Sequence, residues 1–196
     1  KGQDVFVALS CLQSNGNSKE AGQKPLTYLA QFVGNGAEGD ITLELLDKLL
    51  EVEKEVKRSL SPSLETLTIR CNAKLRTCTT IIAQDTATEL VEPSGNISED
   101  EIQHLKQKMY DLVNKKADTK VNAPKALCIM GSMPPGCPNT LYGHLYDIVA
   151  AASATPKESG LLCVVDSVVG LDHLFERMKY HREQQTDAIP KNMLKV

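Results

Sequence analysis

The chain has 196 residues, of which 41% are hydrophobic and 24% charged, and its formal net charge is −3. This composition is that of an ordinary globular protein, and the length allows one sizeable core. There is no basic excess to bind a nucleic-acid backbone, and no apolar run approaches the roughly 20 residues that span a bilayer. We therefore expect neither nucleic acid nor a membrane as a partner.

Six cysteines are scattered along the chain without a Cys-x-x-Cys pair. Several lie within apolar runs, as Cys128 and Cys163 do, which favours buried, reduced thiols over a zinc site or a disulfide framework. A reducing compartment, the cytoplasm, is the expectation that follows. Targeting to an organelle stays open, because a targeting segment would lie upstream of Lys1.

The first part of the chain predicts a helix and then a strand–turn–helix unit. Apolar residues on a helical spacing run from about Val5 to Leu12, and Thr27–Val33 is typical of a strand. A glycine-rich turn follows. An amphipathic helix is then predicted from Ile41 to Arg58, with Asp40 as its N-cap.

The middle of the chain has a different pattern. Polar and apolar residues alternate in Leu64–Ile69 and in Cys78–Ile82, and Asp85–Val91 continues the pattern. Such alternation predicts half-exposed antiparallel strands, not buried parallel ones. We expect them to form an excursion from the main sheet over about residues 64–92.

From Ser98 onward the pattern is that of a parallel α/β sheet. Ser98-Glu99-Asp100-Glu101 is a capping box that predicts the start of a helix. Continuous apolar strands joined by an amphipathic helix are typical of parallel α/β folds. The strands are predicted at Ala126–Met130 and Leu161–Val165, the helices at Thr140–Ala152 and Leu171–His181, and Met193–Val196 would begin one more strand.

The segment Gly34-Asn35-Gly36-Ala37-Glu38-Gly39 matches the dinucleotide fingerprint G-x-G-x-x-G, after a strand and before a helix. The acidic residue of that fingerprint should close a second strand about 20 residues later, whereas Glu53 and Glu55 lie within the predicted helix. Glu38 and Asp40 also place carboxylates where a pyrophosphate would sit. A nicotinamide site is disfavoured, which leaves a close backbone approach to a small ligand or a plain tight turn.

Two further loops carry side chains suited to a ligand. Ser132 lies in Gly131–Gly136, directly after a predicted parallel strand, where ligands bind in open α/β sheets. The alternative is a proline-rich turn without a role. Arg76, before an alternating strand, is either a solvated charge or a fork for a phosphate or carboxylate. The histidines have no metal spacing, so surface or capping roles are expected for His104, His144, His173 and His181.

Six segments follow one another in the order and spacing of a known set of motifs. The first two are Lys1–Val5, like the end of Gly-Gly-Lys-Gly-x-Asn-x-Ala, and Thr27–Gly39, a strand and glycine turn. The third is Lys74–Ile82 together with Thr88–Gly95, like "tR…T…tEl.epG". The last three are Ser98–Glu101, like "is..E"; Gly131–Gly136, like "GSlPpG"; and Leu161–Asp166, like "vilD". Over nearly its whole length the chain thereby resembles the ribokinase (PfkB) family of carbohydrate kinases. It is most similar to the phosphosugar branch, which includes 1-phosphofructokinase and tagatose-6-phosphate kinase.

The resemblance implies a ribokinase-like α/β fold over residues 1–196, as part of a kinase domain that continues beyond both ends. A mostly parallel sheet would be flanked by helices, with a small antiparallel β lid at about 64–92. The implied reaction is transfer of the γ-phosphoryl group of ATP, with Mg²⁺, to a hydroxyl of a sugar or sugar phosphate. The lid would exclude water from the sugar, and two copies could form a homodimer through it.

The resemblance also implies roles for five residues of this sequence. Gly2 and Asp4 would face the sugar hydroxyls, and Arg76 and Ser132 would hold the phosphate of the sugar. Lys195, in a strand resembling the one that leads into the family's Lys-Pro-Asn, would contact the nucleotide. No residue is implied as a metal ligand.

The sequence departs from the family pattern in two ways. Asp4 stands where the family has Asn, Phe6 where it has a small residue, and Val196 where it has Pro. The catalytic base of the family is an Asp in a Gly-x-Gly-Asp motif, which would lie beyond Val196. We therefore expect no kinase activity from the 196 residues alone. A nucleoside or other ribokinase-type kinase, and a non-catalytic α/β binding protein, are the alternatives.

Overall fold

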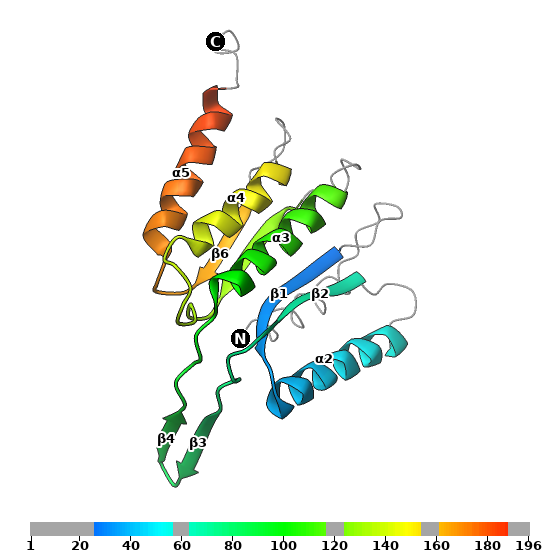
Figure 1. Cartoon of the computed structure of the whole chain (residues 1–196), viewed down its shortest axis with the longest axis vertical. Helices are drawn as coiled ribbons and strands as arrows, with labels where there is room; N and C mark the ends of the chain where they lie inside the picture. The colour runs from blue at the N-terminus through cyan, green and yellow to red at the C-terminus, as the bar shows by residue number, and fades with distance from the viewer. Residues whose placement is uncertain (1–25, 57–62, 117–123, 154–160, 188–196) are drawn as a thin grey trace. The chain divides into compact units, whose positions relative to one another are not determined.

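The computed structural model describes residues 26–56, 63–116, 124–153 and 161–187. Figure 1 draws these residues in colour. They belong to two compact units. Among the described residues, the first unit comprises those up to Leu105 and the stretch Pro134–Cys137, and the second comprises those between Lys106 and Met133 and those from Pro138 onward. The elements predicted at Val5–Leu12 and Met193–Val196 lie outside the described residues.

The first unit begins with the predicted strand–turn–helix. Strand β1 (Leu26–Gly34) leads into helix α2 (Ala37–Val56), and β2 (Ser63–Cys71) follows. Leu29 of β1 and Leu46 of α2 form a small core, with Leu50 packed against it. The amphipathic pattern therefore predicted the helix. Among its described apolar residues, however, only Leu46 is buried, and Ile41, Leu45 and Leu49 are each more than half exposed.

The start of α2 corrects one prediction. The helix begins at Ala37, and the backbone N of Asp40 already donates to the carbonyl of Gly36 at 3.0 Å. Asp40 is therefore inside the first turn and is not the N-cap. A carboxylate is still favourable there, because the first turn lies at the positive end of the helix dipole.

The direction of β2 corrects a second prediction. Residues 63–71 pair parallel with β1, from Leu26↔Ser63 to Gly34↔Cys71, and do not belong to an antiparallel lid. Alternation of polar and apolar residues records which face of a strand is covered, and carries no information about strand direction. In β2, Glu65 is exposed, whereas Ile69 and Cys71 are buried.

The antiparallel excursion is the hairpin of β3 (Cys78–Ala83) and β4 (Thr86–Val91). Gln84 takes the positive φ of 53° in its tight turn. Every residue of both strands is exposed, so neither face of the hairpin is covered by the rest of the described chain. This confirms the small antiparallel sheet, which is shorter than predicted.

Helix α3 (Glu99–Lys116) begins in the first unit at the predicted capping box. The backbone N of Ser98 donates to Oε2 of Glu101 at 2.7 Å, and the N of Glu101 donates to Oγ of Ser98 at 3.4 Å. Ile102, Leu105 and Met109 are buried, as the helical spacing predicted.

The second unit confirms the predicted βαβα order. It contains β5 (Ala126–Met130), α4 (Leu141–Ser153), β6 (Leu162–Asp166) and α5 (Leu171–Asp187), and β5 and β6 are parallel. Ile129, Tyr142 and Leu174 form part of its core, and Leu174 is fully buried. Among the described helices, none is long and apolar enough to cross a membrane.

Candidate functional site

The carboxyl ends of β1 and β2 lie side by side in the first unit. Because the strands are parallel, both polar segments that follow them meet at one edge of the sheet, where ligands of α/β folds bind. The backbone N of Asn35 donates to the carbonyl of Cys71 at 2.7 Å. Nδ2 of the Asn35 side chain donates to Oδ1 of Asn72 at 3.5 Å.

Arg70 holds the glycine turn that follows β1. Its Nη2 lies 2.7 Å from Oδ1 of Asp40, and its Nε donates to Oδ1 of Asn35 at 3.2 Å. One guanidinium thus ties β2 to the turn and to the first turn of α2. Local sequence patterns do not reveal this role, because Arg70 is 30 positions from Asp40 and 35 positions from Asn35.

The glycines of this turn are required by the packing of the chain itself. A Cβ on Gly39 would collide with the carbonyl O of Gly34. A Cβ on Gly34 would meet the backbone of residues 73–75, with the Ala73 carbonyl O at 2.5 Å. The space beside both glycines is filled by backbone of the same chain. This supports a plain tight turn for the G-x-G-x-x-G match over a close backbone approach to a ligand.

The hairpin of β3 and β4 follows this edge of the sheet. Its two strands are first joined at Thr77 and Glu92, which we call the hairpin root. The backbone N of Thr77 donates to Oε2 of Glu92 at 2.8 Å, and the N of Glu92 donates to the Thr77 carbonyl at 3.1 Å. The Thr77 amide, followed by the Lys74 ammonium, lowers the pKa of the Glu92 carboxyl below its usual value. Arg76 is exposed and lies one residue before this closure.

The second unit has its own strand edge at the ends of β5 and β6. The backbone N of Gly131 donates to the carbonyl of Asp166 at 2.8 Å, and the hydroxyl of Tyr142 donates to the carbonyl of Gly131 at 3.2 Å. Gly131 has the positive φ of 92°, which favours glycine. These contacts fix the backbone from which Ser132 extends, and Ser132 is exposed.

The predicted site residues are therefore distributed as follows. Arg76 lies at the hairpin root of the first unit, and Ser132 lies at the strand edge of the second. Gly2, Asp4 and Lys195 lie outside the described residues. The roles of all five stay predictions.

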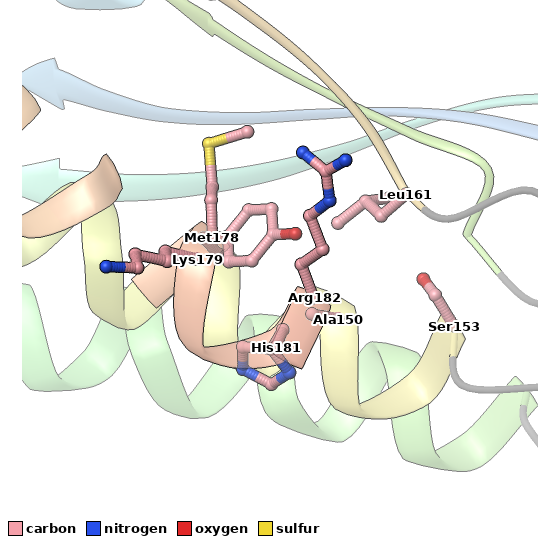
Figure 2. Close-up of a pocket in the computed structure, with 8 residues that line it drawn as sticks. Ala150, Ser153, Leu161, Met178, Lys179, His181 and Arg182 are labelled. Carbon is pink, nitrogen blue, oxygen red and sulfur yellow. The ribbon is translucent and has the colours of Figure 1, made fainter. Parts of the chain in front are cut away.

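A hollow of about 510 Å³ lies at the other end of the second unit (Figure 2). It is bordered by Ser153, at the end of α4, and by Leu161, which precedes β6. This is the amino-terminal end of β6, opposite the edge that carries Ser132. The remaining lining residues come from α4 and α5: Tyr146, Ala150, Met178, Lys179, His181 and Arg182. Its place in the sheet is not where α/β folds bind substrates.

Three of the four histidines correct the prediction of surface or capping roles. His144 and His173 are half-buried, with ring centroids 5.3 Å apart in an edge-to-face arrangement. Burial, followed by the Lys106 ammonium, lowers the pKa of His144. Nε2 of His181 lies 2.9 Å from Oδ1 of Asp147, which also accepts from Nε of Arg177 at 2.9 Å. These side chains fasten α4 to α5, a contact that helical spacing alone does not reveal.

The cysteines agree with the prediction only in part. Those in the described ranges are free thiols, but Cys71 alone is buried, Cys78 is exposed on β3, and the others are half-buried. Burial, reinforced by the Glu101 carboxylate, raises the pKa of the Cys71 thiol to about 11. Burial likewise raises the pKa of Cys137 to about 11. Cys11 lies outside the described residues.

Comparison with known proteins gives similarity of structure without close similarity of sequence. No protein-family model and no curated protein matches the chain. A possible 1-phosphofructokinase from Thermotoga maritima superposes with a TM-score of 0.59 at 16% identity, over 89% of this chain and 44% of that one. The tetrameric inhibited form of phosphofructokinase-2 from Escherichia coli gives 0.55 at 17% identity, over 88% of this chain and 45% of that one.

Most of this chain superposes on each of the two solved structures, but it spans less than half of their length. At such identities the likeness is one of fold. It agrees with the parallel βα units and the small antiparallel hairpin described above, and with the resemblance seen in the sequence motifs. The chain has a ribokinase-like α/β fold, similar to the folds of these two phosphofructokinases.

Proposed function

We propose that this chain supplies the sugar-binding part and the lid of an ATP-dependent kinase that phosphorylates a hydroxyl of a sugar phosphate. The observation that carries the proposal is the exposed hairpin rising from the carboxyl end of a parallel strand, in a fold similar to two phosphofructokinases. A hairpin at that edge of a sheet is suited to cover a bound substrate and exclude water from it.

The phosphate of the substrate would be held by Arg76 and Ser132. A guanidinium presents a fork of N–H donors that matches a phosphate, and a hydroxyl adds a further donor. Both side chains are exposed, each next to a strand edge that could receive a ligand. Gly2 and Asp4 would face the sugar hydroxyls. The carboxylate of Asp4 can accept hydrogen bonds from hydroxyls but cannot donate one.

The cofactors of the proposed reaction are ATP and Mg²⁺. The nucleotide supplies the phosphoryl group, and Lys195 would contact it. Mg²⁺ binds proteins through few carboxylates, and in kinases it binds mainly through the nucleotide phosphates and water.

We also propose that two copies associate through the hairpin. The register places Thr79, Ile81 and Leu90 on one face, which carries no charged side chain along either strand. Ile81 and Leu90 are 50% and 56% exposed. Sedimentation should show a dimer for the native chain and a monomer for Ile81→Asp, and a native chain that sediments as a monomer would contradict this association.

Calorimetric titration tests the proposed substrate class. Fructose 6-phosphate, fructose 1-phosphate and tagatose 6-phosphate are compared with fructose, uridine and inorganic phosphate. At least one sugar phosphate should bind more tightly than fructose. Arg76→Ala should weaken that binding about 10- to 100-fold, because a hydrogen bond to a charged group contributes about 1.5–3 kcal/mol.

Lys74→Ala is the matched control, since it removes an exposed cation from the same segment. It should change the affinity less than about fivefold, because an exposed charge pair contributes about 0–1 kcal/mol. Binding of uridine that Arg76→Ala does not weaken would favour a nucleoside kinase, and no binding of any sugar would favour a non-catalytic protein. The sequence contains no Gly-x-Gly-Asp motif, so ATP-dependent turnover by these 196 residues would overturn the expected division of roles.

A further inference from the structure

One carboxylate contacts both of the segments that join the hairpin to the rest of the first unit. Oε1 of Glu101 accepts from the backbone N of Asn72 at 2.7 Å, and Oε2 accepts from the backbone N of Ser98 at 2.7 Å. Asn72 directly follows β2 on the way into the hairpin, and Ser98 precedes α3 on the way out. Both connections are therefore fastened to the first turn of α3.

The capping box explains only half of this arrangement. The helix end requires the pair of bonds between Ser98 and Glu101. The bond to Asn72 joins residues 29 positions apart and satisfies no donor of the helix. Hydrogen bonds to an ionised acceptor are shorter and stronger than neutral ones. In agreement, the backbone amides of Ser98 and Asn72 lower the pKa of the Glu101 carboxyl.

Close packing stiffens the segment between this fastening and the hairpin. A Cβ on Gly95 would lie 2.7 Å from the Cβ of Ala73, so the incoming and outgoing segments touch there. Beyond it, Glu92 and Thr77 close the root through two hydrogen bonds. Arg76 lies between the two fastenings, and its backbone therefore has little freedom to move independently of α3.

We propose that Glu101 is a positioning residue that fastens the hairpin root to α3 and thereby fixes where Arg76 presents its guanidinium. The part concerning Arg76 rests on the proposed function. The fastening itself does not. Without the carboxylate, the segment from Asn72 to Thr77 samples more conformations, and fewer of them place Arg76 to receive a phosphate. The affinity for a sugar phosphate falls although Arg76 is intact.

The test compares Glu101→Gln with Asp100→Asn. Both changes remove one negative charge from the first turn of α3, but the Asp100 side chain is exposed and makes no hydrogen bond or ion pair with the described residues. Amide hydrogen exchange of the chain without ligand should show about tenfold less protection at Asn72 in Glu101→Gln and no change in Asp100→Asn. The single oxygen of the glutamine amide keeps the capping-box bond to Ser98, and its NH2 group cannot accept from Asn72. Equal protection at Asn72 in the two variants would overturn the fastening.

A second variant separates the fastening from the helix cap. Ser98→Ala removes the hydroxyl that caps α3 but leaves the Glu101 carboxylate and the Asn72 amide. It should leave the protection of Asn72 within about threefold of the native value while fraying the start of α3. Loss of Asn72 protection as large as in Glu101→Gln would assign the effect to the helix end and overturn the proposal.

The link to Arg76 is tested by binding of fructose 6-phosphate. Glu101→Gln should weaken binding about three- to tenfold in the native background and not at all in the Arg76→Ala background, because it acts through Arg76. An equal loss in both backgrounds would show a general structural effect and refute the positioning role. If the native chain binds no sugar phosphate, the proposed function fails, and the exchange experiment still decides the fastening.

Discussion

Gly34→Ala is expected to disturb the hairpin root through a clash that has no easy relief. The added Cβ would meet the Ala73 carbonyl O at 2.5 Å and the Lys74 carbonyl C at 2.8 Å, and would also collide with the backbone N of Leu75. All three are backbone atoms. They belong to the segment that Gly95 packs against and that Glu101 fastens at Asn72, so rotating a side chain cannot relieve the contact.

Overpacking of this kind costs about 1–3 kcal/mol, and a fixed backbone favours the upper end, about 2–3 kcal/mol. Urea unfolding followed by circular dichroism measures it, and the chain contains no tryptophan whose fluorescence could serve. Because the displaced segment leads to Arg76, the affinity for a sugar phosphate should fall as well. Asn35→Ala, at the next position, loses only bonds of 3.2 and 3.5 Å and should cost less than about 1 kcal/mol. A Gly34→Ala chain as stable as the native one would refute the packing argument.

Two further predictions concern stability. Leu174→Ala should lower the free energy of unfolding, measured with urea, by about 2–5 kcal/mol, because Leu174 is fully buried. Phe175→Ala changes the neighbouring side chain, which is 55% exposed, and should lower it by under about 1 kcal/mol. Similar losses of stability in the two variants would mean that α5 is oriented differently. Backbone amides lower the pKa of the Glu92 and Glu101 carboxyls below the usual value of 4.5. The ionised carboxylates therefore stabilise the hairpin root above about pH 4.5, and this stabilisation is lost as the pH falls through the lowered pKa of the folded state. Protection of the Thr77 and Asn72 amides should therefore hold from about pH 7 to about pH 5 and drop below about pH 4.5, and a drop near pH 6.5 would point to histidine instead.

The elements that sequence patterns predicted well are those whose signal is local. The helical spacing of Ile102, Leu105 and Met109, and the capping box before them, are read within a few turns of one helix, and the structure confirms them. The strands at residues 126–130 and 162–166 are likewise local apolar runs, although only Ile129 among their residues is buried. Their parallel pairing followed from the helix between them.

The predictions that failed needed information from distant residues. The alternating pattern of residues 64–69 recorded an exposed face, but only pairing with β1 sets the direction of β2. Asp40 looked like a cap, yet its partner is Arg70, which lies in another element. The contact from Glu101 to Asn72 was also invisible to local reasoning, although the capping role of the same carboxylate was predicted.

The central proposal is that Arg76 and Ser132 hold the phosphate of a sugar phosphate, and a double-mutant cycle tests it most directly. Binding of the preferred sugar phosphate is measured by calorimetry for the native chain, Arg76→Ala, Ser132→Ala and the double variant. If both side chains contact the same phosphate group, each single change weakens binding and their effects differ from additivity by more than about 0.5 kcal/mol. Single changes without effect, or losses that add to within about 0.3 kcal/mol, would contradict the claim.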